Sequence, residues 1–123
     1  MKKYDRESIL KQYEESGQIM YQATLEGDYR SNNREGGKLT KIFKIFEKDQ
    51  ELAEACISEL LCSQNVVIRT KAAAYCLALN MHVDIAQKVL AEISEEDNNG
   101  IFGFNAKMTL EVWKKQGYLN IYK

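Results

Sequence analysis

The stretch that decides the fold is NVVIRTKAAAYCLAL, residues 65–79. Its only charged residues are Arg69 and Lys71, and the eight residues from Ala72 to Leu79 carry no charge. A helix that is apolar on most sides must be covered on most sides. Its alanines also leave room for neighbouring helices to approach closely. We therefore predict that this stretch is the central helix of a small helical protein.

Apolar residues recur three or four positions apart along nearly the whole chain, which is the period of a helix. This spacing predicts a first helix from about Asp5 to Glu26, closed by Gly27, and a second helix over residues 38–48. The intervening DYRSNNREGG, residues 28–37, is irregular and is predicted to be a connector. Three further helices are expected to begin at the Asp49–Gln50 step, after the cap residue Asp84, and near Phe102–Asn105.

Six helices joined by short turns predict an all-α fold, namely an α-α superhelix of about six helices in three antiparallel pairs. We expect one domain over residues 1–123. No segment alternates strictly enough between polar and apolar residues to predict a sheet. Each pair has one apolar face that it cannot bury alone, so stacked pairs would share a continuous core. Ser63 or Asn65 is the expected cap of the central helix, and Gly117 is expected to end the last one.

The composition is that of an ordinary globular protein, with 45% hydrophobic and 28% charged residues and a net charge of −1. This charge gives no overall field that would attract nucleic acid or an anionic membrane. The three cysteines, an odd number, lie among apolar neighbours and are expected to be buried thiols in a reducing cytoplasm. No apolar run follows the first residues or approaches the ~20 residues of a membrane span. We therefore expect a cytoplasmic protein without a membrane segment.

Within the opening stretch, the order Ile68-Arg69-x-x-Ala72-Ala73-x-x-Cys76-Leu77 resembles the second part of a HEAT-type repeat, with cysteine where alanine is usual. Two further segments extend the similarity, GDYRSNNREGGKLTKIFKIF (residues 27–46) and GFNAKMTLEVWKKQGYL (residues 103–119). Together they resemble a family of small bacterial HEAT-like proteins, catalogued as domain of unknown function two-thousand-nineteen. The resemblance implies a stack of helical pairs of the HEAT or ARM kind, and it supplies no catalytic residues.

Basic residues are candidate contacts to a partner, each with a structural alternative. Arg69 could face a partner on a concave surface, or it could bridge to a carboxylate or carbonyl of an adjacent helix pair. Lys38 and Lys41, followed by Lys44 and Lys48, could contact phosphate or an acidic partner. Such a run is more often a solvated face that is balanced by nearby acids.

The predicted connector contains the best candidate for a recognition surface. Tyr29 lies there beside Arg30 and Asn33, so that an aromatic ring is surrounded by hydrogen-bonding groups. Aromatic residues dominate the energetics of interfaces, although capping of the loop is an alternative role. Trp113 lies at helical spacing from Leu110 and is expected to belong to the core.

Residues for catalysis or metal binding are sparse in the sequence. His82 is the only histidine and lies in a predicted turn, where a cap or a surface role is usual. The cysteines lack the CxxC or Cys–His spacing of a zinc site. Nucleophilic catalysis would need a base beside an activated serine or cysteine. We expect no metal, no cofactor and no enzymatic activity.

These features favour a non-enzymatic protein-interaction module, because stacked helical pairs form a curved surface suited to gripping another protein. An immunity-like or antitoxin-like binder is one concrete version, by analogy of fold. The alternative is HEAT-like binding of nucleic acid through the lysine run, which the overall acidity disfavours. A homodimer formed through an exposed helix-pair face is a further alternative.

Overall fold

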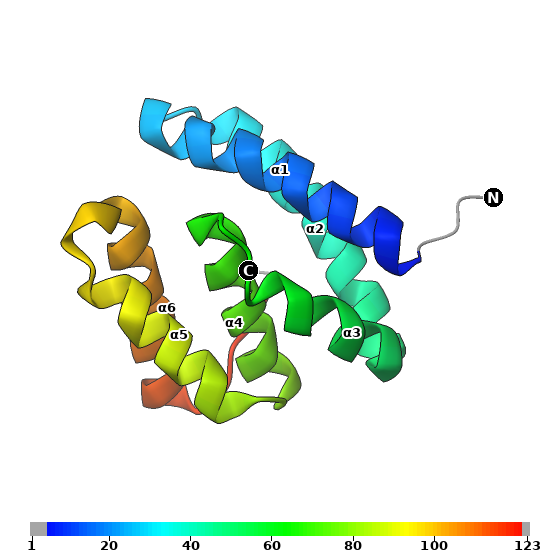
Figure 1. Cartoon of the computed structure of the whole chain (residues 1–123). Coiled ribbons are helices and arrows are strands. Elements are labelled where there is room, and N and C mark those ends of the chain that lie inside the picture. The colour runs from blue at the N-terminus through cyan, green and yellow to red at the C-terminus, as the bar shows by residue number, and fades with distance from the viewer. Residues whose placement is uncertain (1–4, 122–123) are drawn as a thin grey trace.

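The computed structural model describes residues 5–121, and no strand forms within them (Figure 1). The α-helices are α1 (Arg6–Glu26), α2 (Tyr29–Lys48), α3 (Gln50–Leu60), α4 (Val66–Leu79), α5 (Val83–Glu95) and α6 (Ile101–Gln116). A short 3-10 helix, η1 (Asp97–Asn99), precedes α6. The prediction of an all-α fold is confirmed.

Helix α4 lies at the centre of the structure, where it packs against α1, α3, α5 and α6. Every residue from Val66 to Leu79 is buried or partly buried, as the sequence of this helix predicts. Helices α1 and α2 lie side by side and run in opposite directions, and so do α5 and α6 (Figure 1). Of the three predicted pairs, α3 and α4 make the least contact with each other. Helix α4 packs more extensively on α5 than on α3.

The predicted connector over residues 28–37 is wrong, because α2 begins at Tyr29 and runs through this segment. Gly27 ends α1 with a φ of 73°, and Asp28 caps α2 by accepting a 3.1 Å hydrogen bond from the backbone N–H of Ser31. Two residues therefore suffice for the turn between α1 and α2. The Gly36–Gly37 pair lies inside the helix, since packing of the α2 face outweighs the low helix propensity of glycine.

The other helix ends are set by local caps. Asn65 caps α4 by accepting hydrogen bonds from Val67 and Ile68, and Gly117 ends α6 with a φ of 85°, both as predicted. The prediction for Asp84 is wrong: α5 begins at Val83, and His82 occupies the cap position without a side-chain capping bond.

The cysteines and Trp113, which were expected to belong to the core, differ in how deeply they are buried. Cys56 and Cys76 are buried as expected, whereas Cys62 is exposed because it lies beyond the end of α3, in the turn to α4. Trp113 is partly buried and packs against the core. The rule that cysteine is a buried residue type thus holds within the helices and fails in the turn.

Four aromatic side chains join the first helix pair to α4. The ring of Tyr75 on α4 lies 4.8 Å from that of Phe43 and 6.1 Å from those of Tyr13 and Phe46. The phenol oxygens of Tyr13 and Tyr75 are hydrogen-bonded at 2.8 Å. Burial raises the pKa of both phenols, so both remain neutral, and the Tyr13 hydroxyl can donate its proton to the Tyr75 hydroxyl in the core. Each aromatic pair adds about 0.5–1.5 kcal/mol beyond the burial of its area.

Helices α1 and α4 approach most closely at Gly17. A Cβ atom at this position would lie 2.5 Å from Cγ1 of Ile68 and 3.1 Å from Nδ2 of the cap residue Asn65. Glycine is therefore required at this contact for a steric reason, because its backbone conformation is ordinary helix.

Replacement of Gly17 by alanine should therefore destabilise the fold by about 1–3 kcal/mol, because the methyl group would push Ile68 and Asn65 apart. The matched control is Gly37→Ala in α2, where a Cβ meets no atom within 4 Å. The control should stabilise by about 0.5–1 kcal/mol through helix propensity alone. Urea unfolding followed by circular dichroism measures both changes, and a neutral or stabilising Gly17→Ala would contradict the close crossing.

Candidate functional site

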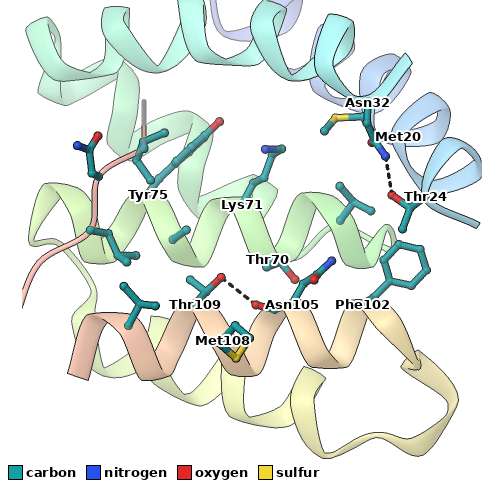
Figure 2. A pocket seen from close by; sticks show the side chains of 16 residues that line it. Met20, Thr24, Asn32, Thr70, Lys71, Tyr75, Phe102, Asn105, Met108 and Thr109 are labelled. Atoms are coloured by element: carbon teal, nitrogen blue, oxygen red, sulfur yellow. Dashed lines mark hydrogen bonds between the residues drawn. The ribbon is translucent and has the colours of Figure 1, made fainter. Parts of the chain in front are cut away.

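A groove of about 560 Å³ opens between α2 and α6, with α4 as its floor (Figure 2). This volume lies in the range of ligand-binding clefts. The side towards the first helix pair is formed by Met20, Thr24 and Asn32. The C-terminal segment Leu119–Ile121 lines the groove as well.

Helices α4 and α6 each line the groove with residues that recur at helical spacing. Residues 67, 70, 71 and 74 of α4 and residues 105, 108, 109 and 112 of α6 all line it. Both sets have the i, i+3, i+4, i+7 spacing that places side chains on one face of a helix. The floor is thus the one face of α4 that no neighbouring helix covers, and it mixes the apolar Val67 and Ala74 with the polar Thr70 and the charged Lys71.

Among residues 5–121, Lys71 is the only charged residue that lines the groove. Its partly buried side chain rises from α4 towards α2, into the open space (Figure 2). Within residues 5–121 no ion pair or hydrogen bond engages its ammonium group. Burial lowers the pKa of the Lys71 ammonium, since desolvation disfavours the charged form. The groove therefore holds a cation that no carboxylate of residues 5–121 compensates.

The rim of the groove on α6 carries an exposed apolar stripe. Ile101, Phe104, Met108 and Val112 follow one another at helical spacing and are 51%, 59%, 41% and 39% exposed. Met108 and Val112 also line the groove, so its apolar surface continues outward over α6. The apolar groove and this stripe form one continuous surface, which is larger than a scatter of single exposed residues.

One end of the groove lies where α1 meets α6. The ring of Phe102, which lines the groove, stacks on Tyr21 with centroids 4.6 Å apart. Nearby, the side-chain amide of Asn32 donates a 3.0 Å hydrogen bond to the hydroxyl of Thr24 (Figure 2). The aromatic stack thus joins α1 to α6 across this end of the groove, and the hydrogen bond joins α1 to α2 within one wall.

The candidates Tyr29, Arg30 and Asn33 lie on the first turns of α2 and are exposed, with 67% of Tyr29 accessible to solvent. None of them lines the groove, although their neighbour Asn32 does. The structure thus brings the predicted recognition segment to the edge of the groove without making these three residues part of its lining.

Arg69 hydrogen-bonds to backbone carbonyls of the chain, although not to those expected. Its Nη1 donates hydrogen bonds to the backbone carbonyls of Ser63 at 3.1 Å and Gln64 at 3.4 Å. These carbonyls belong to the turn that precedes α4, and not to an adjacent helix pair as predicted. The guanidinium therefore holds the α3–α4 turn, a use to which its fixed planar geometry is well suited.

Lys38 forms an ion pair with the buried carboxylate of Glu35, and Lys41 is exposed. Glu35 also accepts a 2.8 Å hydrogen bond from the hydroxyl of Ser16 on α1 and a 3.1 Å bond from Nε of Arg34. Burial by itself would raise the pKa of Glu35, but these hydrogen bonds and the charge of Lys38 outweigh it and hold the pKa below its usual value. Lys38 thus belongs to a polar contact between α1 and α2.

The candidate metal ligand His82 lies outside the groove, and the described residues also bear on metal binding and on membrane spans. His82 lies at the surface, with Nε2 2.8 Å from the carboxylate of Glu54. Residues 5–121 contain no group of three or more His, Cys, Asp and Glu side chains arranged to hold a metal ion. Over the same range, each helix is too short or too polar to cross a lipid bilayer.

Sequence reasoning missed Lys71, although the pattern contained a sign of it. Lys71 is, with Arg69, one of the two charges in a helix predicted to be covered on most sides. Comparisons with models of protein families, with curated proteins and with solved structures find no match for the chain. The groove and the residues in it are therefore the features that bear on its function.

The lowered pKa of Glu35 makes stability depend on pH in a defined direction. Its contribution is present above the unfolded-state pKa of about 4.3 and is lost as the pH falls through the lower folded-state value. Glu35→Gln should cost about 1–3 kcal/mol at pH 7 and should flatten the acid side of the stability profile. Glu92→Gln, at an exposed position on α5, is the matched control. Chemical unfolding between pH 3 and 7 tests this, and parallel profiles for Glu35→Gln and wild type would contradict it.

Replacement of Lys71 by methionine should increase the free energy of unfolding at pH 7 by about 0.5–1 kcal/mol, because it removes a desolvated charge with which no residue in the range 5–121 pairs. The pKa of Lys71 is lowered on folding, so wild type gains stability as the pH rises through that value, and the advantage of methionine should shrink at alkaline pH. Lys88→Met on the exposed face of α5 is the control. A destabilised Lys71→Met variant would show that the ammonium is stabilised in the free protein.

Proposed function

We propose that this chain is a non-enzymatic helical-repeat module that binds another protein in the groove between α2, α4 and α6. These are the second helices of the three predicted pairs, and stacked pairs of the HEAT or ARM kind present such helices on a concave binding surface. Membership of the small bacterial HEAT-like family is part of this proposal. An immunity-like or antitoxin-like binder acting in the cytoplasm is its most concrete form.

The observation that carries the proposal is the continuity of apolar surface from the groove onto the stripe of Ile101, Phe104, Met108 and Val112. A contiguous exposed apolar surface with a polar surround is characteristic of interaction sites in soluble proteins. Helical partners and extended peptides are both bound in grooves of this kind, where apolar anchors enter between helices.

The proposal is tested by capture from a native lysate of the source organism with three baits, namely wild type, Met108→Glu and Ile85→Glu. Met108 lies in the groove and is 41% exposed, whereas Ile85 is a similarly exposed apolar residue on α5, outside the groove. Wild type and Ile85→Glu should recover the same stoichiometric partner, and Met108→Glu should recover at least about ten-fold less, which corresponds to ~1.4 kcal/mol.

Two results would contradict the proposal. One is that wild type recovers no stoichiometric partner. The other is that Met108→Glu and Ile85→Glu recover equal amounts of it, since binding would then not involve the groove. Quantitative mass spectrometry with unfolding curves for each bait separates loss of binding from loss of the fold.

A further inference from the structure

The charge in the groove is uncompensated within the described part of the chain. The carboxylates of Glu35 and Glu59 form ion pairs with other cations, Glu54 lies against Nε2 of His82, and none of the three lines the groove. The residues that line the groove with Lys71 are uncharged within the described part of the chain, among them Val67, Thr70, Ala74 and Tyr75 of the same helix and Met108 of α6. A cation held among uncharged groups loses hydration and gains no partner, so a carboxylate brought to it would be bound strongly.

We propose that the groove recognises a segment of a partner protein that places one aspartate or glutamate carboxylate on the Lys71 ammonium, with apolar residues on either side of the acid. This inference rests on the proposed function and specifies the chemistry of its partner. Thr70 and Asn105 line the α6 side of the groove, whereas Lys71 points towards α2, and their side chains offer hydrogen-bond donors to other polar groups of the same segment (Figure 2).

The surroundings of Lys71 favour a protein segment over a nucleic acid as the occupant. Nucleic-acid sites neutralise several phosphates with several basic residues, whereas this groove has one cation and a largely apolar lining. The apolar stripe from Ile101 to Val112 extends over about 16 Å of helix. That length matches roughly five extended residues, or three helical turns, of a bound segment. The apolar flanks supply contact area, and the single acid fixes the register.

The test uses a displayed library of random 12-residue peptides, selected on wild type and counter-selected on Met108→Glu so that only binders of the groove remain. The selected peptides should share one Asp or Glu between apolar residues. For a synthetic peptide from this set, replacing the acid by its amide should weaken binding to wild type by about ten-fold. The same replacement should change binding to Lys71→Met by less than about two-fold, since the charge pair is already absent.

A charge exchange provides the matching gain of function. The Lys71→Glu variant should bind the peptide in which the acid is replaced by lysine more tightly than it binds the original peptide. In carbon NMR of the lysine side chain, the pKa of Lys71 should rise when the acidic peptide binds and stay unchanged with the amide peptide. A merely structural lysine would show neither effect.

The outcomes separate this inference from the proposed function. If peptides bind the groove of wild type and lose affinity for Met108→Glu, but show no preference for an acid, the role of Lys71 is overturned and the proposed function stands. If no peptide binds in the groove, both are overturned. If octanoate binds at Lys71 while acidic peptides do not, the groove takes a small carboxylate, and the assignment to a protein segment is overturned.

Discussion

The packing of α4 against α1 is the contact on which the rest of the structure depends. At one point it needs a glycine, because Gly17 lies against Ile68 with no space for a methyl group. At another it needs two buried tyrosines, Tyr13 and Tyr75, whose hydroxyls are hydrogen-bonded to each other in the core. These two requirements fix the distance and the register of the helices, and Phe43 and Phe46 extend the same aromatic contact to α2.

The groove is a consequence of this arrangement. Helix α4 has neighbours on α1, α3, α5 and α6, but α2 contacts it mainly through the aromatic rings near Tyr75. The face of α4 that carries Thr70, Lys71 and Ala74 is therefore left open between α2 and α6. A helix in a central position that keeps one uncovered face provides a rigid floor for binding, and rigid elements position functional side chains better than loops do. Desolvation disfavours the charged form of Lys71 in the free protein, and functional sites commonly carry groups of this kind at the expense of stability.

Much of this fold could be predicted from the sequence, and the failures have identifiable physical causes. The alanine-rich stretch of residues 65–79 predicts a covered helix correctly, because helical period and composition are local properties. The segment 28–37 was predicted as a connector because its asparagines and glycines are weak helix formers. Its Asp28 cap and the buried contact of Glu35 with Ser16 on α1 make it helical, and the second of these is a tertiary contact that no local pattern contains.

The candidate site was harder to predict than the fold for the same reason. Arg69 stood out by its place in a repeat-like motif, yet it binds the carbonyls of its own turn. Lys71, two residues later, lies in the groove, and its neighbours on α6 are more than thirty positions away in the sequence. Periodicity assigns a residue to a face of its helix, but only the packing of the other helices decides whether that face is covered.

Amide hydrogen exchange in the native protein tests the central position of α4 most directly. The account predicts that the amides of Ala73 to Leu77 exchange only through global unfolding, with a free energy of exchange equal to that measured by urea unfolding. Exchange of these amides through local opening, at a free energy no higher than that of the exposed helix ends, would contradict it.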